Sequence, residues 1–373
     1  MPVYKQITNG DPEGSVTKVL LALAEGVGAQ VICAPFYLSG QEAPVVQVRK
    51  MSPDLPPVAF LDPFYHFSTA ALLGRIARSS KTLEPMVVIL RPCDHRALVE
   101  LAKLQQIPMS SLTTVVYECP GTVPGKHAPQ LDRPARKKLA RELVQGYPHE
   151  EPSIPVREAC RACVLTESPS ADLRVLWRGT DPWQEIYWEG ESRTGSTALE
   201  SAGLVAGELP EKREDEQKRW KAEHLAFREE RIRRFRQLYQ GAEGLQLALA
   251  SCVGCQNCRQ ACPLCYCRTC VFNGPDMETS WETVAAWLKG RSAVRLPVDT
   301  LLYHLVRMSH MAHACLACGL CGQACPMDVP VDLLFLVGGQ VAQEVLGYRP
   351  GERLDEPPPQ GTFREEEFQE LGE

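Results

Sequence analysis

The chain has 373 residues, enough for two or three domains, and its 44% hydrophobic and 23% charged composition excludes wholesale disorder and fibrous repeats. The net charge of −6 gives no general electrostatic reason to expect nucleic-acid or anionic-membrane binding. Because no segment approaches the ~20 apolar residues of a membrane span, and residues 1–15 lack the features of a signal peptide, we expect a cytoplasmic protein.

Residues 1–180 are expected to form an α/β domain with a parallel or mixed sheet and helical cover, because apolar strands alternate with helices. The pattern predicts strands at 28–34, 86–90 and 113–117, and helices at 16–25 and 94–106. The Pro-, Lys- and Arg-rich insert 120–138 and the Pro-containing stretch 148–155 are expected to be surface loops.

Residues 181–245 are expected to form a charged helical connector. Within it, residues 211–240 predict one helix of mixed charge, for which the mixed signs favour a solvated connector over a partner-docking helix. Its possible anchors are Trp220, Leu225, Ile232, Phe235 and Leu238. A cysteine-rich domain is expected at 246–348, followed by an acidic, Pro-rich tail at 349–373 that is either disordered or ordered by a partner.

Cysteine is the most informative residue type. The chain contains sixteen cysteines, and eleven of them lie between Cys252 and Cys325. In a reducing cytoplasm, cysteines spaced in this way are expected to bind metal rather than to form disulfides.

Two copies of the pattern C-x2-C-x2-C-x3-C-P occur in this region. The pattern is that of bacterial two-cluster ferredoxins, in which three close thiolates hold one cubane and the fourth reaches the other. We therefore predict one [4Fe–4S] cluster on Cys252, Cys255, Cys258 and Cys325, and a second on Cys315, Cys318, Cys321 and Cys262. Gly254 and Gly319 would let backbone amides approach the cluster sulfurs. The alternative, a pair of structural zinc sites, fits two complete four-cysteine runs less well.

The 44 residues between the two runs, 271–314, predict a mostly helical dicluster domain, with helices at 280–290 and 298–314. His304, His310 and His313 are expected to be packing or surface residues, because the cysteines already complete the clusters. Cys33, Cys265, Cys267 and Cys270 receive no role from the sequence. The last three could tune the first cluster, cap another metal or be structural.

Four further cysteines lie upstream. Cys93 and Cys119 each follow a predicted strand, and Cys160 and Cys163 form an isolated C-x2-C. If the two strands are parallel neighbours, Cys93 and Cys119 emerge at the same edge of the sheet, where ligands of α/β sheets gather. The four thiols then form one ligand set; alternatively they are unrelated cysteines that pack as small hydrophobic residues.

The order of these motifs resembles the beta-subunit family of coenzyme F420-reducing hydrogenases and F420-dependent formate dehydrogenases. The resemblance spans residues 80–345 and is carried by RPCDHRALVELAKLQQI, VVYECPGTVPG, EACRACVLTESPSADLRVLWRG and CVGCQNCRQACPLCYCRTC. It implies a third [4Fe–4S] cluster on Cys93, Cys119, Cys160 and Cys163, and a bound FAD whose binding residues no motif identifies. Arg91 is a departure, since many members carry a small residue before the Pro-Cys pair.

The resemblance implies an electron-transfer subunit that connects a hydride carrier, F420 or nicotinamide, with a catalytic subunit. That partner would be a formate dehydrogenase, a hydrogenase or a heterodisulfide-reductase-type complex. No residue is expected to be an acid–base catalyst. Two other classes of function stay open: a flavin-free ferredoxin-like adaptor and a zinc-stabilised scaffold.

Overall fold

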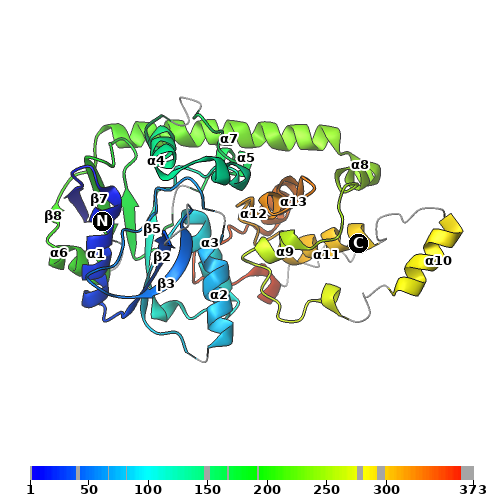
Figure 1. Ribbon diagram of the computed structural model, residues 1–373, viewed down its shortest axis with the longest axis horizontal. Helices are drawn as coiled ribbons and strands as arrows, with labels where there is room; N and C mark the ends of the chain where they lie inside the picture. The colour runs from blue at the N-terminus through cyan, green and yellow to red at the C-terminus, as the bar shows by residue number, and fades with distance from the viewer. Residues whose placement is uncertain are drawn as a thin grey trace, which may run out of the picture.

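The computed structural model describes residues 2–38, 43–65, 67–80, 82–146, 152–165, 168–190, 193–274, 280–291 and 299–362. Figure 1 shows an elongated molecule with a sheet and its covering helices at one end and a helical region at the other. One long helix, α7 (Lys212–Leu238), runs along both parts. No helix in the described ranges is long and apolar enough to cross a membrane.

The sheet is mixed, with eight strands in the order β3-β2-β4-β5-β6-β7-β1-β8. The centre is parallel: β4 pairs with β2 on one side and with β5 on the other, and β5 pairs with β6. The outer strands β3, β7, β1 and β8 pair antiparallel. The strands are β1 (Val3–Ile7), β2 (Val31–Phe36), β3 (Val45–Lys50), β4 (Met86–Leu90), β5 (Leu112–Tyr117), β6 (Leu173–Leu176), β7 (Glu185–Gly190) and β8 (Val205–Ala206).

Both faces of the sheet are covered. Along β4, Val87 and Ile89 enter one core while Val88 and Leu90 enter the other, as expected of a strand whose side chains alternate. The first core contains residues of α1 (Pro12–Gly26) and α6 (Arg193–Ser201), and the second contains residues of α2 (Thr69–Ser79) and α3 (Pro92–Lys103). The result is a three-layer α/β arrangement.

Local signals set the ends of these helices. Asp11 Oδ1 accepts a hydrogen bond from Gly14 N at 3.0 Å and caps α1, and Ser68 Oγ caps α2 through Ala71 N at 3.3 Å. The helix α3 starts at Pro92, where the missing amide costs nothing, and has Asp94 in its first turn. This start matters because Cys93 is the next residue.

The predicted mixed sheet is confirmed, and β4 lies at the expected 86–90. The sheet extends past the expected domain end at residue 180, because β7 pairs with both β6 and β1 and thereby joins the start of the chain to its middle. The insert at 120–138 is not only loop, since α4 (Arg133–Arg141) begins within it. Buried Arg136 of α4 pairs with Asp62 at 3.1 Å, so this helix is fixed to the domain.

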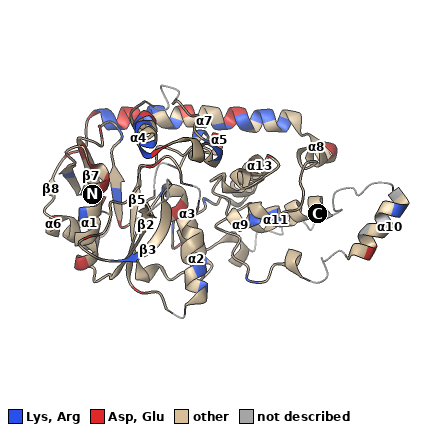
Figure 2. Cartoon of the chain, viewed as in Figure 1, with Lys and Arg blue, Asp and Glu red and all other residues tan. Residues whose placement is uncertain are grey.

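The charged helix expected at 211–240 is observed as α7, and Figure 2 shows residues of both charge signs along its length. Trp220, Ile232 and Phe235 are buried, whereas Leu225 and Leu238 are 43% and 58% exposed. Trp220 faces the α/β part and Phe235 belongs to the core of the C-terminal region. One face of α7 therefore packs against both parts of the molecule.

The C-terminal region is helical, as expected. Its core contains Cys252 and Cys258 together with Tyr303, Val331 and Phe335. Its helices are α8 (Gly241–Ala248), α9 (Asn257–Ala261), α10 (Trp281–Arg291), α11 (Asp299–Met311), α12 (Leu320–Gln323) and α13 (Val331–Leu346), and a short helix α5 (Glu158–Arg161) lies in the α/β part.

The start of the tail is held against α3. Buried Glu100 accepts hydrogen bonds from Tyr348 Oη and Gly351 N, both at 2.7 Å, and pairs with Lys103 at 3.1 Å. Residues 363–373 of the tail, for which disorder or ordering by a partner is expected, lie outside the described residues.

Candidate metal centres

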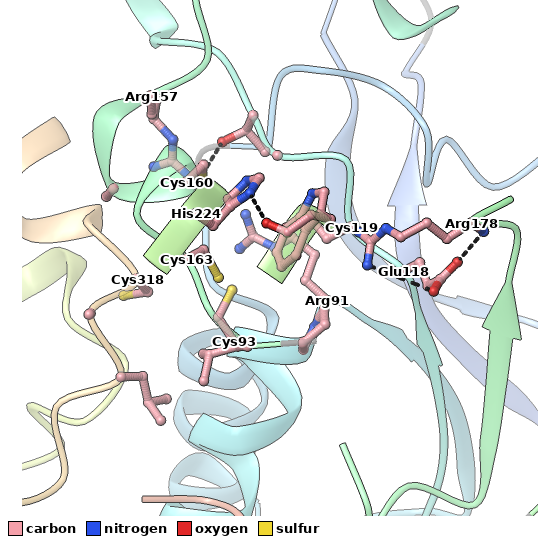
Figure 3. Close-up of a pocket in the computed structure, with 18 residues that line it drawn as sticks. Arg91, Cys93, Glu118, Cys119, Arg157, Cys160, Cys163, Arg178, His224 and Cys318 are labelled. Atoms are coloured by element: carbon pink, nitrogen blue, oxygen red, sulfur yellow. Dashed lines mark hydrogen bonds and ion pairs between the residues drawn. The ribbon is translucent and has the colours of Figure 1, made fainter. Parts of the chain in front are cut away.

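The four upstream cysteines meet at one edge of the sheet. β4 and β5 are parallel neighbours, so Cys93, at the start of α3, and Cys119, two residues after β5, emerge at the same edge. Cys160 belongs to α5, and Cys163 follows it. All four line one cavity of about 40 Å³ (Figure 3), in which Cys93 and Cys163 point toward each other. The grouping of the four thiols required parallel neighbouring strands before Cys93 and Cys119, and β4 and β5 are such strands.

This cavity is rich in arginine. Arg91, Arg157 and Arg178 line it with the thiols, and the Nη2 of Arg157 lies 3.4 Å from Cys160 Sγ. Burial would raise the pKa of Cys160, but the charge of Arg157 and a hydrogen bond with Thr122 outweigh burial, so the pKa lies below its ordinary value. The arginines would offset the negative charge of thiolates bound to a cluster.

Burial dominates at the other three thiols. It raises the pKa of Cys119 to about 12 and of Cys163 to about 11, and it raises the pKa of Cys93 well above the ordinary value. In the metal-free protein these three groups are therefore neutral thiols, and cluster binding must release their protons.

Arg91, the residue before the Pro-Cys pair, is a fixed part of this edge. It is 1% exposed and forms an ion pair with Asp94 at 2.7 Å. It also donates hydrogen bonds to the carbonyl oxygens of Tyr65 and Phe67 at 3.2 and 3.1 Å. Asp94 in turn accepts a hydrogen bond from Ser68 Oγ at 2.7 Å, so Arg91 and Asp94 connect the Cys93 turn to the start of α2.

The helix α7 closes the cavity. Trp220 and His224 line it and stack on each other with ring centroids 3.7 Å apart. The guanidinium of Arg178 lies over the Trp220 ring at 4.2 Å. Glu118 forms an ion pair with Arg213 of α7 at 2.8 Å. Burial opposes the ionisation of Glu118, but the charges of Arg178 and Arg213 hold its pKa below its usual range. These contacts fix α7 over the four thiols.

The first predicted dicluster set also lies together. Cys252, Cys255, Cys258 and Cys325 line a cavity of about 10 Å³, although Cys325 is far from the others in the chain. Three side chains of α11 approach its sulfurs: Arg307 Nη1 lies 3.1 Å from Cys258 Sγ, Tyr303 Oη 3.6 Å from the same sulfur, and His304 Nε2 3.4 Å from Cys252 Sγ.

The two cysteine loops share one backbone conformation. Two residues of each loop have positive φ, and they stand at matching positions. They are Gly254 and Gln256 in the loop that begins at Cys252, and Ala317 and Gly319 in the loop that begins at Cys315. In the second loop this turns the Ala317 amide toward Cys315 Sγ at 3.4 Å. Each run places glycine at only one of the two positions. The residues at the other positions, Gln256 and Ala317, accept a conformation that costs ~1 kcal/mol.

The second predicted set brings its fourth cysteine from the first loop. Cys262 and Cys318 are close enough that the charge of Cys318 raises the Cys262 pKa, although the largest cause is a hydrogen bond with Cys265. Burial raises the pKa of Cys321, and the charges of Cys318 and Cys315 add to this effect. Both the assignment of Cys262 to this set and the occupancy of the set by a cluster stay predictions.

Cys318 also lies beside the upstream cysteines. Together with Leu316 and Ala317, it lines the cavity of the four upstream cysteines (Figure 3). Two other contacts dock the loops here: Arg157 is hydrogen bonded to Gln323 of α12, and Gly319 lies against Ala159 of α5 so closely that a Cβ at 319 would overlap the Ala159 Cβ. The upstream site and the second dicluster site are thus adjacent.

The remaining predictions have mixed outcomes. His310 is exposed, and His313 is buried beside Tyr348, but His304 contacts a predicted ligand sulfur rather than only packing. Cys33 is fully buried in the sheet core, Cys265 is hydrogen bonded to Cys262, and Cys267 is exposed. No group of three or more His, Cys, Asp or Glu side chains in the described ranges is placed to hold a single metal ion.

Sequence reasoning missed the arginines that contact the thiols and the closure by α7. The available signal was weak: Tyr303, His304 and Arg307 fall on one face of a helix at i, i+1 and i+4, where a cation at a core position is unusual. Arg157 lies three residues before Cys160, which alone indicates nothing.

Comparisons with known proteins find a matching domain family and similar proteins. A 4Fe-4S dicluster domain family matches residues 213–329. The beta subunit of F420-dependent formate dehydrogenase 1 from Methanococcus maripaludis is 26% identical over 319 residues, which cover 74% of this chain and 75% of the relative. The beta subunit of the F420-dependent formate dehydrogenase from Methanocaldococcus jannaschii is 26% identical over 313 residues, or 76% and 78% of the two chains.

Among solved structures, a chain of the F420-reducing [NiFe] hydrogenase complex from Methanosarcina barkeri aligns with a TM-score of 0.45 and 12% identity, over 65% of this chain and 94% of that one. The curated relatives and the domain match confirm the resemblance that the cysteine motifs predicted. The chain contains a match to a 4Fe-4S dicluster domain and is similar, over about three quarters of its length, to the beta subunits of F420-dependent formate dehydrogenases.

Proposed function

We propose that the chain holds three [4Fe–4S] clusters in series and connects a hydride carrier with a catalytic subunit. The observation that carries the proposal is the position of Cys318, which belongs to the second dicluster motif and also lines the cavity of Cys93, Cys119, Cys160 and Cys163. The three ligand sets then follow one another: the upstream set, the second dicluster set through Cys318, and the first dicluster set through the neighbouring Cys258 and Cys262.

Each part of the protein has a definite task in this proposal. When bound, a [4Fe–4S] cluster accepts and donates single electrons at a potential that its surroundings set. The thiolates hold the clusters, and Arg157 and Arg307 offset their negative charge at Cys160 and Cys258. Trp220 and His224 exclude water from the upstream site. The Ala317 amide donates to Cys315 Sγ in the second loop, and the Gly254 amide donates to the Cys252 sulfur in the first.

We further propose a bound FAD, on the strength of the family resemblance. A flavin exchanges a hydride on one side and single electrons on the other, which such a relay needs. A cavity of about 410 Å³ adjoins the upstream site and shares Trp220 and Arg178 with it. The lining includes the cations of Arg178 and Lys212, which would meet the phosphates, and the carboxylates of Asp181 and Glu216, which would not. The proposal of a flavin in this cavity therefore rests on its position beside the upstream site and on the family resemblance.

The partner and carrier follow from the relatives. We propose that the hydride carrier is F420 or a nicotinamide and that the partner is the catalytic subunit of a formate dehydrogenase, a hydrogenase or a heterodisulfide-reductase-type complex. The cysteine-rich composition, with its many thiols kept for metal, suits a reducing compartment, so we propose a cytoplasmic location.

Iron, acid-labile sulfide and flavin per chain, measured on protein purified without oxygen, test the proposal. We expect about 12 iron, about 12 sulfide and one flavin. About 8 iron and no flavin would instead indicate a ferredoxin-like adaptor in which the upstream cysteines only pack. Three clusters without flavin would support the relay and refute the flavin. A colourless, zinc-containing protein would refute both.

A further inference from the structure

Arg307 is a buried cation that faces cluster thiols instead of a carboxylate. It lies on α11, is 4% exposed and is enclosed by two aromatic rings, with its guanidinium 4.7 Å from the centroid of Phe335 and 5.6 Å from that of Tyr303. Nη1 lies 3.1 Å from Cys258 Sγ, and Nη2 donates to the Cys258 carbonyl oxygen at 3.3 Å.

Three other buried arginines of the described residues pair with carboxylates, whereas buried Arg157, like Arg307, lies beside a cysteine sulfur. Arg91 pairs with Asp94 at 2.7 Å, Arg136 with Asp62 at 3.1 Å and Arg213 with Glu118 at 2.8 Å. Within the described part of the chain, Arg307 forms no ion pair with any carboxylate. An unpaired buried charge is costly, so a counter-charge must come from elsewhere.

The counter-charges available to Arg307 are sulfurs from both dicluster sets. Burial opposes its charge, but Cys258, Cys265 and Cys262 raise the pKa of Arg307 above its ordinary value, so the guanidinium stays protonated. Cys258 belongs to the first predicted ligand set and Cys262 to the second. Arg307 contacts the first set directly through Cys258, and Cys262 follows one helical turn later at the end of α9.

We propose that Arg307 is a positioning residue that raises the reduction potentials of both dicluster clusters by stabilising their reduced forms. Reduction adds negative charge to a cluster, and a fixed cation beside its sulfur lowers the energy of the more negative state. The effect is strong here because the aromatic enclosure keeps water away from the guanidinium. The proposal rests on the clusters proposed above and goes beyond them by naming the residue that sets their potentials.

The test is a redox titration of the anaerobic full-length protein, followed by EPR, for wild type, Arg307→Gln and Arg307→Lys, with iron content measured on each. Gln removes the charge but keeps a hydrogen-bond donor, whereas Lys keeps the charge at shorter reach. We expect both dicluster potentials to become more negative in Arg307→Gln and to move less in Arg307→Lys. The upstream cluster is an internal control and should keep its potential.

Arg233→Gln, the same change on the exposed side of α7, is the matched control and should leave every potential unchanged. Arg307→Gln with full iron and wild-type potentials would overturn the proposal, as would equal shifts in the Gln and Lys variants. If Arg307→Gln loses iron, Arg307→Lys decides: dicluster potentials that stay near the wild-type values or become slightly more negative support the proposal, and raised potentials contradict it. Wild-type protein without the dicluster iron would refute the proposed function itself, which keeps the two failures distinct.

Discussion

The two cysteine regions build their sites in opposite ways. In the C-terminal loops, three thiols of each predicted site come from seven consecutive residues, and the assignment makes Cys262 and Cys325 cross between the sites. In the upstream site, the thiols come from three separate segments, at Cys93, Cys119 and the Cys160–Cys163 turn, and they meet only because β4 and β5 are parallel neighbours. A local site can be recognised from spacing, whereas the upstream one depends on the fold.

The regions also differ in how they are enclosed. The upstream thiols are closed by α7 through Trp220 and His224 and surrounded by three arginines. The first dicluster set is covered by its own domain, through α11, and Cys255 is exposed. This difference predicts a protected site next to the sheet and a site near the surface from which a partner can exchange electrons.

The most severe test of the link between the regions is Cys318→Ala. We expect the second dicluster cluster to be lost, iron to fall from about 12 to about 8 per chain, and electron transfer between the outer sites to stop, because the middle site is then empty. Cys33→Ala, a change at a buried cysteine in the sheet core, is the control and should keep all the iron. Full iron in Cys318→Ala would show that the ligand assignment is wrong.

Cys160→Ala separates the two regions. We expect loss of the upstream cluster alone, which leaves about 8 iron on the dicluster loops, since those loops carry a complete ligand set of their own. The measurement is iron content together with EPR of the reduced protein. An unaltered spectrum and iron count would remove the third cluster from the account.

Gly319→Ala tests the docking of the loop on α5. Gly319 has φ +71°, and a Cβ there would overlap that of Ala159, so we expect a loss of about 2 kcal/mol or more, measured as a lowered thermal midpoint. Gly347→Ala is the matched control, because Gly347 has φ +59° with nothing within 4 Å of the added Cβ, and it should cost only about 1 kcal/mol. Adding Ala159→Gly should restore part of the stability that Gly319→Ala loses, and it should restore none in Gly347→Ala. Equal losses of stability in the two alanine variants would argue against the contact between residues 319 and 159.

The smallest expected effect concerns pH. Burial lowers the pKa of His224 to about 4, from an ordinary value near 6.5, so acidification below pH 6.5 protonates the unfolded chain more than the folded one and lowers stability. Between pH 7.5 and 5.5 this residue should account for about 1 kcal/mol of lost stability. His224→Phe keeps an aromatic ring on Trp220 and should lose less stability over this range than wild type does. An identical pH dependence of the two thermal midpoints would contradict the assignment.

The same comparison explains which parts of the structure could be predicted from the sequence. The strand β4 and the helix α7 depend on local pattern, and residues close in the chain were enough to predict their positions. The pairing of β1 with β7 depends on residues about 180 positions apart, so the domain end at residue 180 could not be placed correctly. The contacts of Arg157 and Arg307 with sulfur depend on packing between helices and loops, which no periodicity records.

The adjacency of the upstream and second dicluster sites is the central claim, and EPR of the fully reduced protein tests it most directly. Two paramagnetic clusters on either side of Cys318 should interact and split or broaden each other's signals. We predict that the dicluster signals sharpen in Cys160→Ala, because the upstream cluster is then absent. A dicluster spectrum of the same shape in wild type and Cys160→Ala, with the upstream iron shown to be lost, would contradict the account.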